Sequence, residues 1–201
     1  MILKKYFVNL SLISIFFFLF VQKSFSLERG PTEFIQLTVN EASSALSSNF
    51  TKEEKIKKLR KIAKESVDIK GIGFYTLGSY RKTINDSEKE KYLTLFEQYF
   101  LKSFSDRLTE YTDPKVVVQS SKKISEKYTI VSSILVATDK RPEVKIDWRV
   151  YTKNSENPLI RDLIIEGLSL ARTQKEEFSS IIQSNDGDIK ALFSSLEKFI
   201  D

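Results

Sequence analysis

Two residue types that often carry chemistry are missing from this chain of 201 residues, which has no cysteine and no histidine. Without cysteine the protein forms neither a disulfide framework nor a thiolate metal site, and a leader cannot be followed by a lipid-modified cysteine. Without histidine we expect no zinc-type site, no histidine-dependent catalytic triad and no ordinary general base near neutral pH. We therefore expect no metal centre.

Sequence motifs for nucleotide, calcium or acyl-enzyme chemistry are also lacking, since no G-x-S-x-G, G-x-G-x-x-G or EF-hand loop occurs. Gly73 and Gly78 have the offset of a phosphate-binding loop, but Ser79 stands where that loop needs lysine. We therefore reject nucleotide binding there and expect no cofactor. Paired carboxylates could still perform acid–base chemistry, although most acids lie beside lysines on polar helix faces.

The N-terminus has the pattern of a secretory signal peptide. Lys4 and Lys5 precede an apolar run over 6–21, and the polar segment "QKSFSLERG" follows with small residues at Ser24 and Ser26. We predict a signal peptide over 1–26, cleaved after Ser26, because the run is too short for a confident transmembrane span. A retained membrane anchor is the alternative.

The mature chain is close to neutral. Removal of residues 1–26 takes away three of the 32 basic residues, so 29 of them face 27 acidic ones and the net charge is about +2. This near-neutral balance argues against nucleic acid as the main partner, which would require a strongly basic face. Residues 27–201 suit one soluble domain, which in a two-membrane bacterium would be periplasmic.

Helices are predicted in the first half of the mature chain. Apolar residues recur at helical spacing over 32–46. A second helix begins at "TKEE", where Thr51 and Glu54 have the spacing of a capping box, and a third begins where Asn85 precedes Glu88 by three residues.

The third helix carries a broad apolar stripe, and six of its seven residues are aromatic: Tyr92, Phe96, Tyr99, Phe100, Phe104, Leu108 and Tyr111. Such a stripe is usually core, but its width suggests that it also lines something. Before this helix, Gly71, Gly73 and Gly78 interrupt a run of large apolar residues over 68–82. Glycines at these positions would let two helices or strands approach closely. A closed apolar cavity between helices and a curved sheet would use this surplus of apolar surface, and plain core packing is the alternative.

Strands follow the helices. Four segments have strand patterns, over 115–120, 127–138, 143–151 and 158–167. The third alternates cleanly, with Val144, Ile146, Trp148 and Val150 on one face. Two more helices are predicted at 169–184 and 188–200. Helices, then an antiparallel meander, then helices predict an α+β fold.

The order of these motifs resembles the MlaC or toluene-tolerance-type family of periplasmic phospholipid carriers. The resemblance runs from about Val39 to Ile200 and rests on "YTLGSYRKT" before the aromatic helix, on "VKIDWRVY", and on "RDLIIEGLSL" followed by "EEFSSII". Three residues depart from the family pattern: Arg81 replaces an aromatic residue, Pro158 a tryptophan and Arg161 a tyrosine.

The resemblance implies a twisted antiparallel sheet of about four to five strands, wrapped by about six helices and enclosing an apolar lipid pocket. It implies a monomeric, non-catalytic carrier that shuttles phospholipids between the outer and inner membranes and maintains outer-membrane lipid asymmetry. The implied partners are an outer-membrane lipoprotein–porin complex and an MCE-domain protein of an inner-membrane ABC transporter.

Large apolar residues of the matching segments are expected to contact acyl chains: Phe74, Leu77, Tyr80, Phe96, Phe100, Ile146, Trp148, Ile165, Leu168 and Phe178. Ordinary core packing is the alternative for each, and Trp148 could face either side of the sheet. Leu168 is expected to point into the cavity.

Four further residues have expected roles outside the apolar lining. Gly78 and Gly167 are expected to permit tight turns. Arg81 and Lys82 are expected to contact a lipid phosphate or an acidic partner, with a solvated turn as the alternative.

Two other classes of function stay open. A hydrolase or isomerase would use Asp147 or Asp162 as an acid with a raised pKa in an apolar pocket. A non-transporting periplasmic adaptor or chaperone would have a filled core, exposed apolar patches and no stoichiometric lipid.

Overall fold

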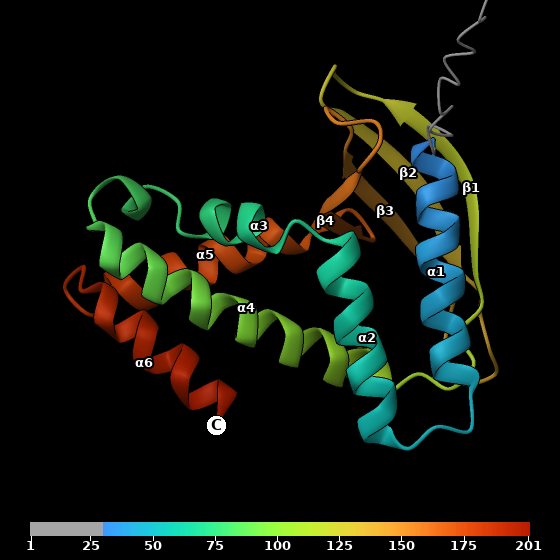
Figure 1. The fold of residues 1–201 in the computed structure, drawn as a ribbon, viewed down its shortest axis with the longest axis horizontal. Coiled ribbons are helices and arrows are strands. Elements are labelled where there is room, and N and C mark those ends of the chain that lie inside the picture. The colour runs from blue at the N-terminus through green and yellow to red at the C-terminus, as the bar shows by residue number, and fades with distance from the viewer. Residues whose placement is uncertain (1–29) are drawn as a thin grey trace, which may run out of the picture.

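The computed structural model describes residues 30–201, so the predicted signal peptide over 1–26 lies outside the described residues. Residues 30–201 form six α-helices, one short 3₁₀-helix and a five-stranded sheet (Figure 1). The predicted α+β class is confirmed. Within this range no helix is both long and apolar enough to cross a membrane.

The elements form three blocks along the chain, first helices, then strands, then helices. The first block contains α1 (Pro31–Ser47), α2 (Lys52–Ser66), α3 (Ile69–Thr76), η1 (Tyr80–Lys82) and α4 (Asp86–Thr109). The second contains β1 (Val116–Lys123), β2 (Tyr128–Leu135), β3 (Val144–Tyr151), β4 (Leu159–Ile165) and β5 (Leu168–Ser169). The third contains α5 (Leu170–Gln183) and α6 (Ile189–Ile200).

Two of the helices begin at the capping boxes that the sequence predicts. The Thr51 side chain accepts a hydrogen bond from the Glu54 amide (3.2 Å), and the Glu54 carboxylate accepts one from the Thr51 amide (2.9 Å). Asn85 and Glu88 repeat this exchange at the start of α4 (2.9 and 3.0 Å). Each box satisfies amides that have no partner within the helix, so local chemistry determines where α2 and α4 start.

The short helix α3 is not predicted by the sequence, because two of its eight residues are glycines, which are poor helix formers. Packing against α4 explains the glycine at position 73. A Cβ atom on Gly73 would lie 2.9 Å from Phe96 Cδ1 and 3.2 Å from Leu93 Cδ2, both on α4. Only a glycine allows the two helices to approach this closely.

The sheet is a meander in the order β1-β2-β3-β4-β5, with every neighbouring pair antiparallel. One of its faces packs against α1 (Figure 1). Ile35 and Val39 of α1 are buried there with Val131, Val150 and Ile160 of the three central strands. We call these five residues the sheet core.

A second hydrophobic cluster lies among the helices. Figure 1 shows α3, α4, α5 and α6 grouped on one side of the molecule, α1 and the sheet on the other, and α2 between them. The buried residues of this helical core include Ile72, Leu77, Tyr92, Phe96, Phe178, Ile182, Leu192, Phe193 and Leu196. The described chain therefore has two hydrophobic cores.

An ion pair attaches the junction of α2 and α3 to β4. Arg161 Nε donates to Asp68 Oδ2 (2.6 Å), and Arg161 Nη2 lies 2.5 Å from the same oxygen. The guanidinium also lies over the Tyr151 ring, 4.3 Å from its centroid. Partial burial lowers the pKa of Arg161, but the Asp68 charge and the hydrogen bonds to it outweigh that effect, so the pKa is raised overall. Asp68 Oδ1 meanwhile accepts from the Gly71 amide (2.8 Å) and caps α3.

The next residue of β4, Asp162, attaches the start of α5. This carboxylate is 3% exposed, accepts hydrogen bonds from Ser169 Oγ (2.7 Å) and the Ala171 amide (3.0 Å), and lies 3.5 Å from Arg149 Nη1. Ser169 Oγ in turn accepts from the Arg172 amide and caps α5 (3.1 Å). Two hydrogen bonds and one ion pair thus compensate the buried charge.

We expect Asp162→Ala to lower the free energy of unfolding by about 3 kcal/mol, because it removes one member of a buried, hydrogen-bonded ion pair. Asp147→Ala is the matched control, since the half-buried Asp147 accepts from Ser132 Oγ (2.6 Å) and its loss should cost about 1 kcal/mol. Urea unfolding followed by circular dichroism measures both values. Equal costs for the two variants would contradict the proposed attachment.

A second prediction concerns Tyr92, which is 0% exposed and whose hydroxyl lies 2.8 Å from Thr76 Oγ1. Burial raises the pKa of this phenol above its ordinary value, although the Thr76 hydrogen bond lowers it. The resulting stability is present below the unfolded pKa of about 10 and is lost as pH rises above it, because only the unfolded state then ionises readily.

Tyr92→Phe should therefore cost about 1 kcal/mol at neutral pH. Its free energy of unfolding should then fall less steeply than that of the wild type as the pH is raised above about 10. Urea unfolding at neutral and alkaline pH tests this, and parallel losses in both proteins would show that Tyr92 does not contribute.

Candidate functional site

An apolar pocket of about 530 Å³ lies between the sheet core and the helical core. Its walls come from α1 and α2, from Ile72 of α3, from α4 between Phe96 and Leu108, from the start of α5 and from β1 to β4. This volume lies within the range of sites that enclose small organic ligands. The sequence-based expectation of an apolar pocket between helices and sheet is confirmed.

The sheet wall is built by the alternation of β3. Val144, Ile146 and Trp148 all line the pocket, and in the next strand Leu163 pairs with Trp148 and Ile165 with Ile146. Trp148 Nε1 donates to Ser133 Oγ (2.8 Å) on β2, so the polar atom of the indole is satisfied within the sheet. The ring is thereby free to form part of the apolar wall.

The opposite wall is the aromatic stripe of α4. Phe96 belongs both to the helical core and to the pocket lining. Phe100 and Phe104 stack with centroids 5.8 Å apart and also line the pocket. Tyr99 donates to Gln174 Oε1 of α5 (2.8 Å), and its pKa is raised, first by burial and then by the Glu177 charge. The prediction that this stripe both fills core and lines a space is confirmed.

The structure brings together half of the residues expected to contact acyl chains. The five that line the pocket are Phe96, Phe100, Ile146, Trp148 and Ile165. Their contact with a lipid stays a prediction.

Four other expected residues lie away from the lining. Leu77 and Phe178 are buried in the helical core, with exposures of 1% and 2%. Tyr80 packs against the same core, and Phe74 is half-buried on α3. Their placement at the pocket was wrong because the helices of this layer pack these faces among themselves.

The expectation that Leu168 points into the cavity is also wrong. Glu166 (φ 49°) and Gly167 (φ 83°) form a two-residue turn of type I′ character, so that Ile165 pairs with Leu168 in a hairpin. Leu168 therefore belongs to the two-residue strand at the edge of the sheet, where it is 59% exposed. Gly167 adopts the left-handed conformation that favours glycine, and so does Gly78 (φ 59°).

Arg81 and Lys82 form part of η1, are exposed and do not line the pocket. Their expected contact with a lipid phosphate inside the site is therefore not supported by their position. Contact with an acidic partner stays a prediction.

Sequence reasoning missed the wall formed by α1 and α2: Thr38, Val39, Ala42, Ser43, Leu46, Ile62, Ser66 and Val67. Helical periodicity marked a buried face on both helices, but it does not say which element that face meets. It also missed Arg107, because a charged residue in the last turn of a helix has an ordinary explanation.

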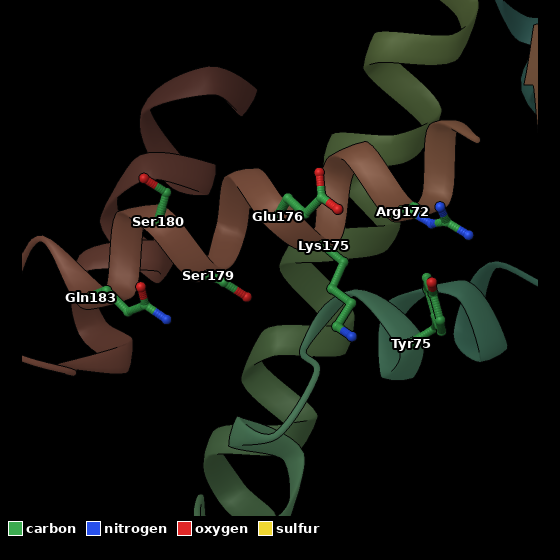
Figure 2. A pocket seen from close by; sticks show the side chains of 7 residues that line it. All are labelled: Tyr75, Arg172, Lys175, Glu176, Ser179, Ser180 and Gln183. Atoms are coloured by element: carbon green, nitrogen blue, oxygen red, sulfur yellow. The ribbon is translucent and has the colours of Figure 1, made fainter. Parts of the chain in front are cut away.

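A second hollow, of about 410 Å³, lies on the outer side of α5. Figure 2 shows Lys175 extending from α5 toward Tyr75 of α3, and its Nζ lies 5.5 Å from the centre of that ring. The other lining residues are all polar: Arg172, Glu176, Ser179, Ser180 and Gln183. This surface does not suit an apolar ligand.

The two carboxylates considered for catalysis differ in position. Asp162 lines the pocket but its oxygens accept the bonds described above, and Asp147 does not line it. Over residues 30–201, no three acidic side chains are grouped so as to hold a metal ion. The arrangement suits binding of an apolar ligand better than acid–base chemistry.

Comparison with solved structures finds a similar fold in the phospholipid-binding protein from Ralstonia solanacearum, whose structure is a complex with a phospholipid. The TM-score is 0.70 with 15% sequence identity, and the match covers 84% of this chain and 96% of the other. At this identity the likeness establishes the fold alone.

Sequence comparison finds a relative in Haemophilus influenzae, the intermembrane phospholipid transport system binding protein MlaC. It is 24% identical over 207 residues, which cover 98% of this chain and 93% of the relative. The family model described as MlaC protein matches residues 36–198. That match spans most of the chain, and the protein described here belongs to the MlaC family.

Proposed function

We propose that this protein is a soluble periplasmic carrier that shuttles phospholipids between the outer and inner membranes. The observation that carries the proposal is the apolar pocket between the two hydrophobic cores. The H. influenzae relative is named as a binding protein of an intermembrane phospholipid transport system, and the R. solanacearum neighbour was solved with a phospholipid, and both support this choice.

The pocket wall suits acyl chains because it is built from aliphatic and aromatic side chains of α4, β3 and β4. Each buried methylene stabilises a complex by about 0.8 kcal/mol, so a chain of about sixteen carbons gains on the order of 12 kcal/mol before losses. Two chains would nominally exceed the practical limit of about 18–21 kcal/mol. Release of a diacyl lipid into water is therefore slow, and the carrier transfers its cargo by docking to membrane partners.

The proposed partners are an outer-membrane lipoprotein–porin complex and an MCE-domain protein of an inner-membrane ABC transporter. The carrier acts as a monomer after removal of residues 1–26, needs no cofactor and catalyses no reaction. A hydrolase would need a carboxylate free to exchange protons with a ligand. Asp162 instead accepts hydrogen bonds from Ser169 and Ala171, which supports a structural role.

Native mass spectrometry of the gently purified mature protein tests the proposal, followed by organic extraction and identification of the lipid. We expect stoichiometric diacyl phospholipid. A folded protein that is reproducibly empty, even after incubation with phospholipid vesicles, would overturn the carrier function and favour an adaptor.

A matched pair of substitutions tests whether the pocket holds the lipid. Ile146→Glu places a carboxylate on the apolar wall, where an unpaired charge is costly, and should reduce bound lipid at least tenfold. Leu168→Glu introduces the same group two strands away on an exposed edge and should leave lipid content unchanged. Extraction from both variants measures this, with circular dichroism to verify folding. Equal lipid in the two proteins would show that the pocket is not the binding site.

A further inference from the structure

The pocket reaches solvent between the end of α4 and the start of α5. Of the residues that line it, only Arg107 and Leu170 are exposed. Tyr92 packs against Phe178, and Tyr99, further along α4, bonds to Gln174, which comes earlier in α5. The two helices therefore run antiparallel, and this order brings the C-terminal end of α4 and the N-terminal end of α5 toward the same side. Arg107 and Leu170 thus mark the mouth of the pocket.

The pocket lining contains two charged residues, Asp162 and Arg107, and only the charge of Asp162 is compensated by other residues of the protein. Asp162 is buried, and its charge is compensated by Ser169, Ala171 and Arg149. The Arg107 guanidinium makes no hydrogen bond or ion pair with any residue of the described range 30–201. The charge left available to a ligand in this pocket is therefore positive.

The neighbours of Arg107 extend this polar mouth. Ser103 lies one helical turn before Arg107 in α4, Tyr111 lies just beyond the end of that helix, and both line the pocket. The Arg141 guanidinium lies over the Tyr111 ring, 4.9 Å from its centroid, and adds a second positive charge beside the mouth. The adjacent acids Asp106 and Glu110 are exposed but do not belong to the lining.

We propose that Arg107 binds the phosphate of the lipid headgroup at the mouth of the pocket, an assignment that rests on the proposed carrier function. A guanidinium presents paired N–H donors that match two phosphate oxygens. With the acyl chains held against α4 and β3, the phosphate remains at the solvent boundary, where Arg107 lies. The contact selects lipids that carry a phosphodiester over diacylglycerol, which offers the same chains without the charge.

An arginine in the last turn of a helix also interacts favourably with the helix dipole. That structural role alone would lower stability on substitution and leave lipid selectivity unchanged, so selectivity is the informative readout.

The test is a competition between two lipids with identical chains. Lipid-free mature protein is equilibrated with mixed detergent micelles that contain equal amounts of phosphatidylglycerol and diacylglycerol. The protein is then re-isolated, and both lipids are quantified by mass spectrometry. The wild type should favour phosphatidylglycerol, and Arg107→Gln should lower this ratio about fivefold, the effect of one partly solvated charged hydrogen-bond pair.

Two control variants separate local charge from the specific contact. Arg172→Gln removes an exposed arginine of α5 that faces the outer hollow (Figure 2) and should leave the ratio unchanged. Arg107→Lys keeps the charge without the planar fork and should give an intermediate ratio. If Arg107→Gln does not fold, Arg107→Lys alone tests the proposal. Its ratio of phosphatidylglycerol to diacylglycerol must then be lower than that of the wild type.

The outcomes distinguish this assignment from the carrier function itself. Normal total lipid with an unchanged ratio in Arg107→Gln would overturn the role of Arg107 and leave the carrier function intact. A wild type that takes up neither lipid would overturn the carrier function. Saturable binding of inorganic phosphate to lipid-free protein that is abolished in Arg107→Gln, together with an unchanged lipid ratio in that variant, would identify a free-phosphate site in place of a headgroup contact.

Discussion

Two adjacent side chains of β4 attach the helical layer to the sheet, and the position of the pocket depends on them. Arg161 binds the α2–α3 junction through Asp68, and Asp162 binds the start of α5. Neighbouring residues of a regular strand point to opposite faces, but β4 has an irregular register here. Arg149 pairs with Asp162 and Val150 with Ile160, so Arg161 is an extra residue. Such a bulge breaks the alternation of side chains between the two faces of the strand, so that consecutive residues can bind neighbouring helices.

The pocket follows from how these attachments distribute the apolar surface. α1 covers the sheet over Val131, Val150 and Ile160, where the sheet core is filled. Ile146 and Ile165, toward the other end of β3 and β4, face the helices across an open space. The helices cannot close it, because α3, α5 and α6 use their apolar faces to fill the helical core. The space between two separately filled cores is the proposed binding site.

The features that the sequence predicts well are those determined within a few residues. Thr51 and Asn85 cap helices through partners three residues away, and the alternation of β3 identifies Ile146 and Trp148 as one face. The features that it does not predict depend on tertiary packing. Phe178 has the same apolar character as Phe100, yet one fills the helical core and the other lines the pocket. The pattern shows that a face is buried, not which core buries it.

Because both hydrophobic cores border the pocket, whatever fills it becomes part of the protein interior. A ligand that binds only the folded state raises the free energy of unfolding according to its concentration and affinity. A ligand in the pocket would therefore connect two cores that otherwise meet mainly through β4 and α2. Without a ligand, the protein would unfold less cooperatively. If the protein is the proposed carrier, a membrane partner that removes the ligand would thus have to compensate for the cohesion that the protein loses at the same moment.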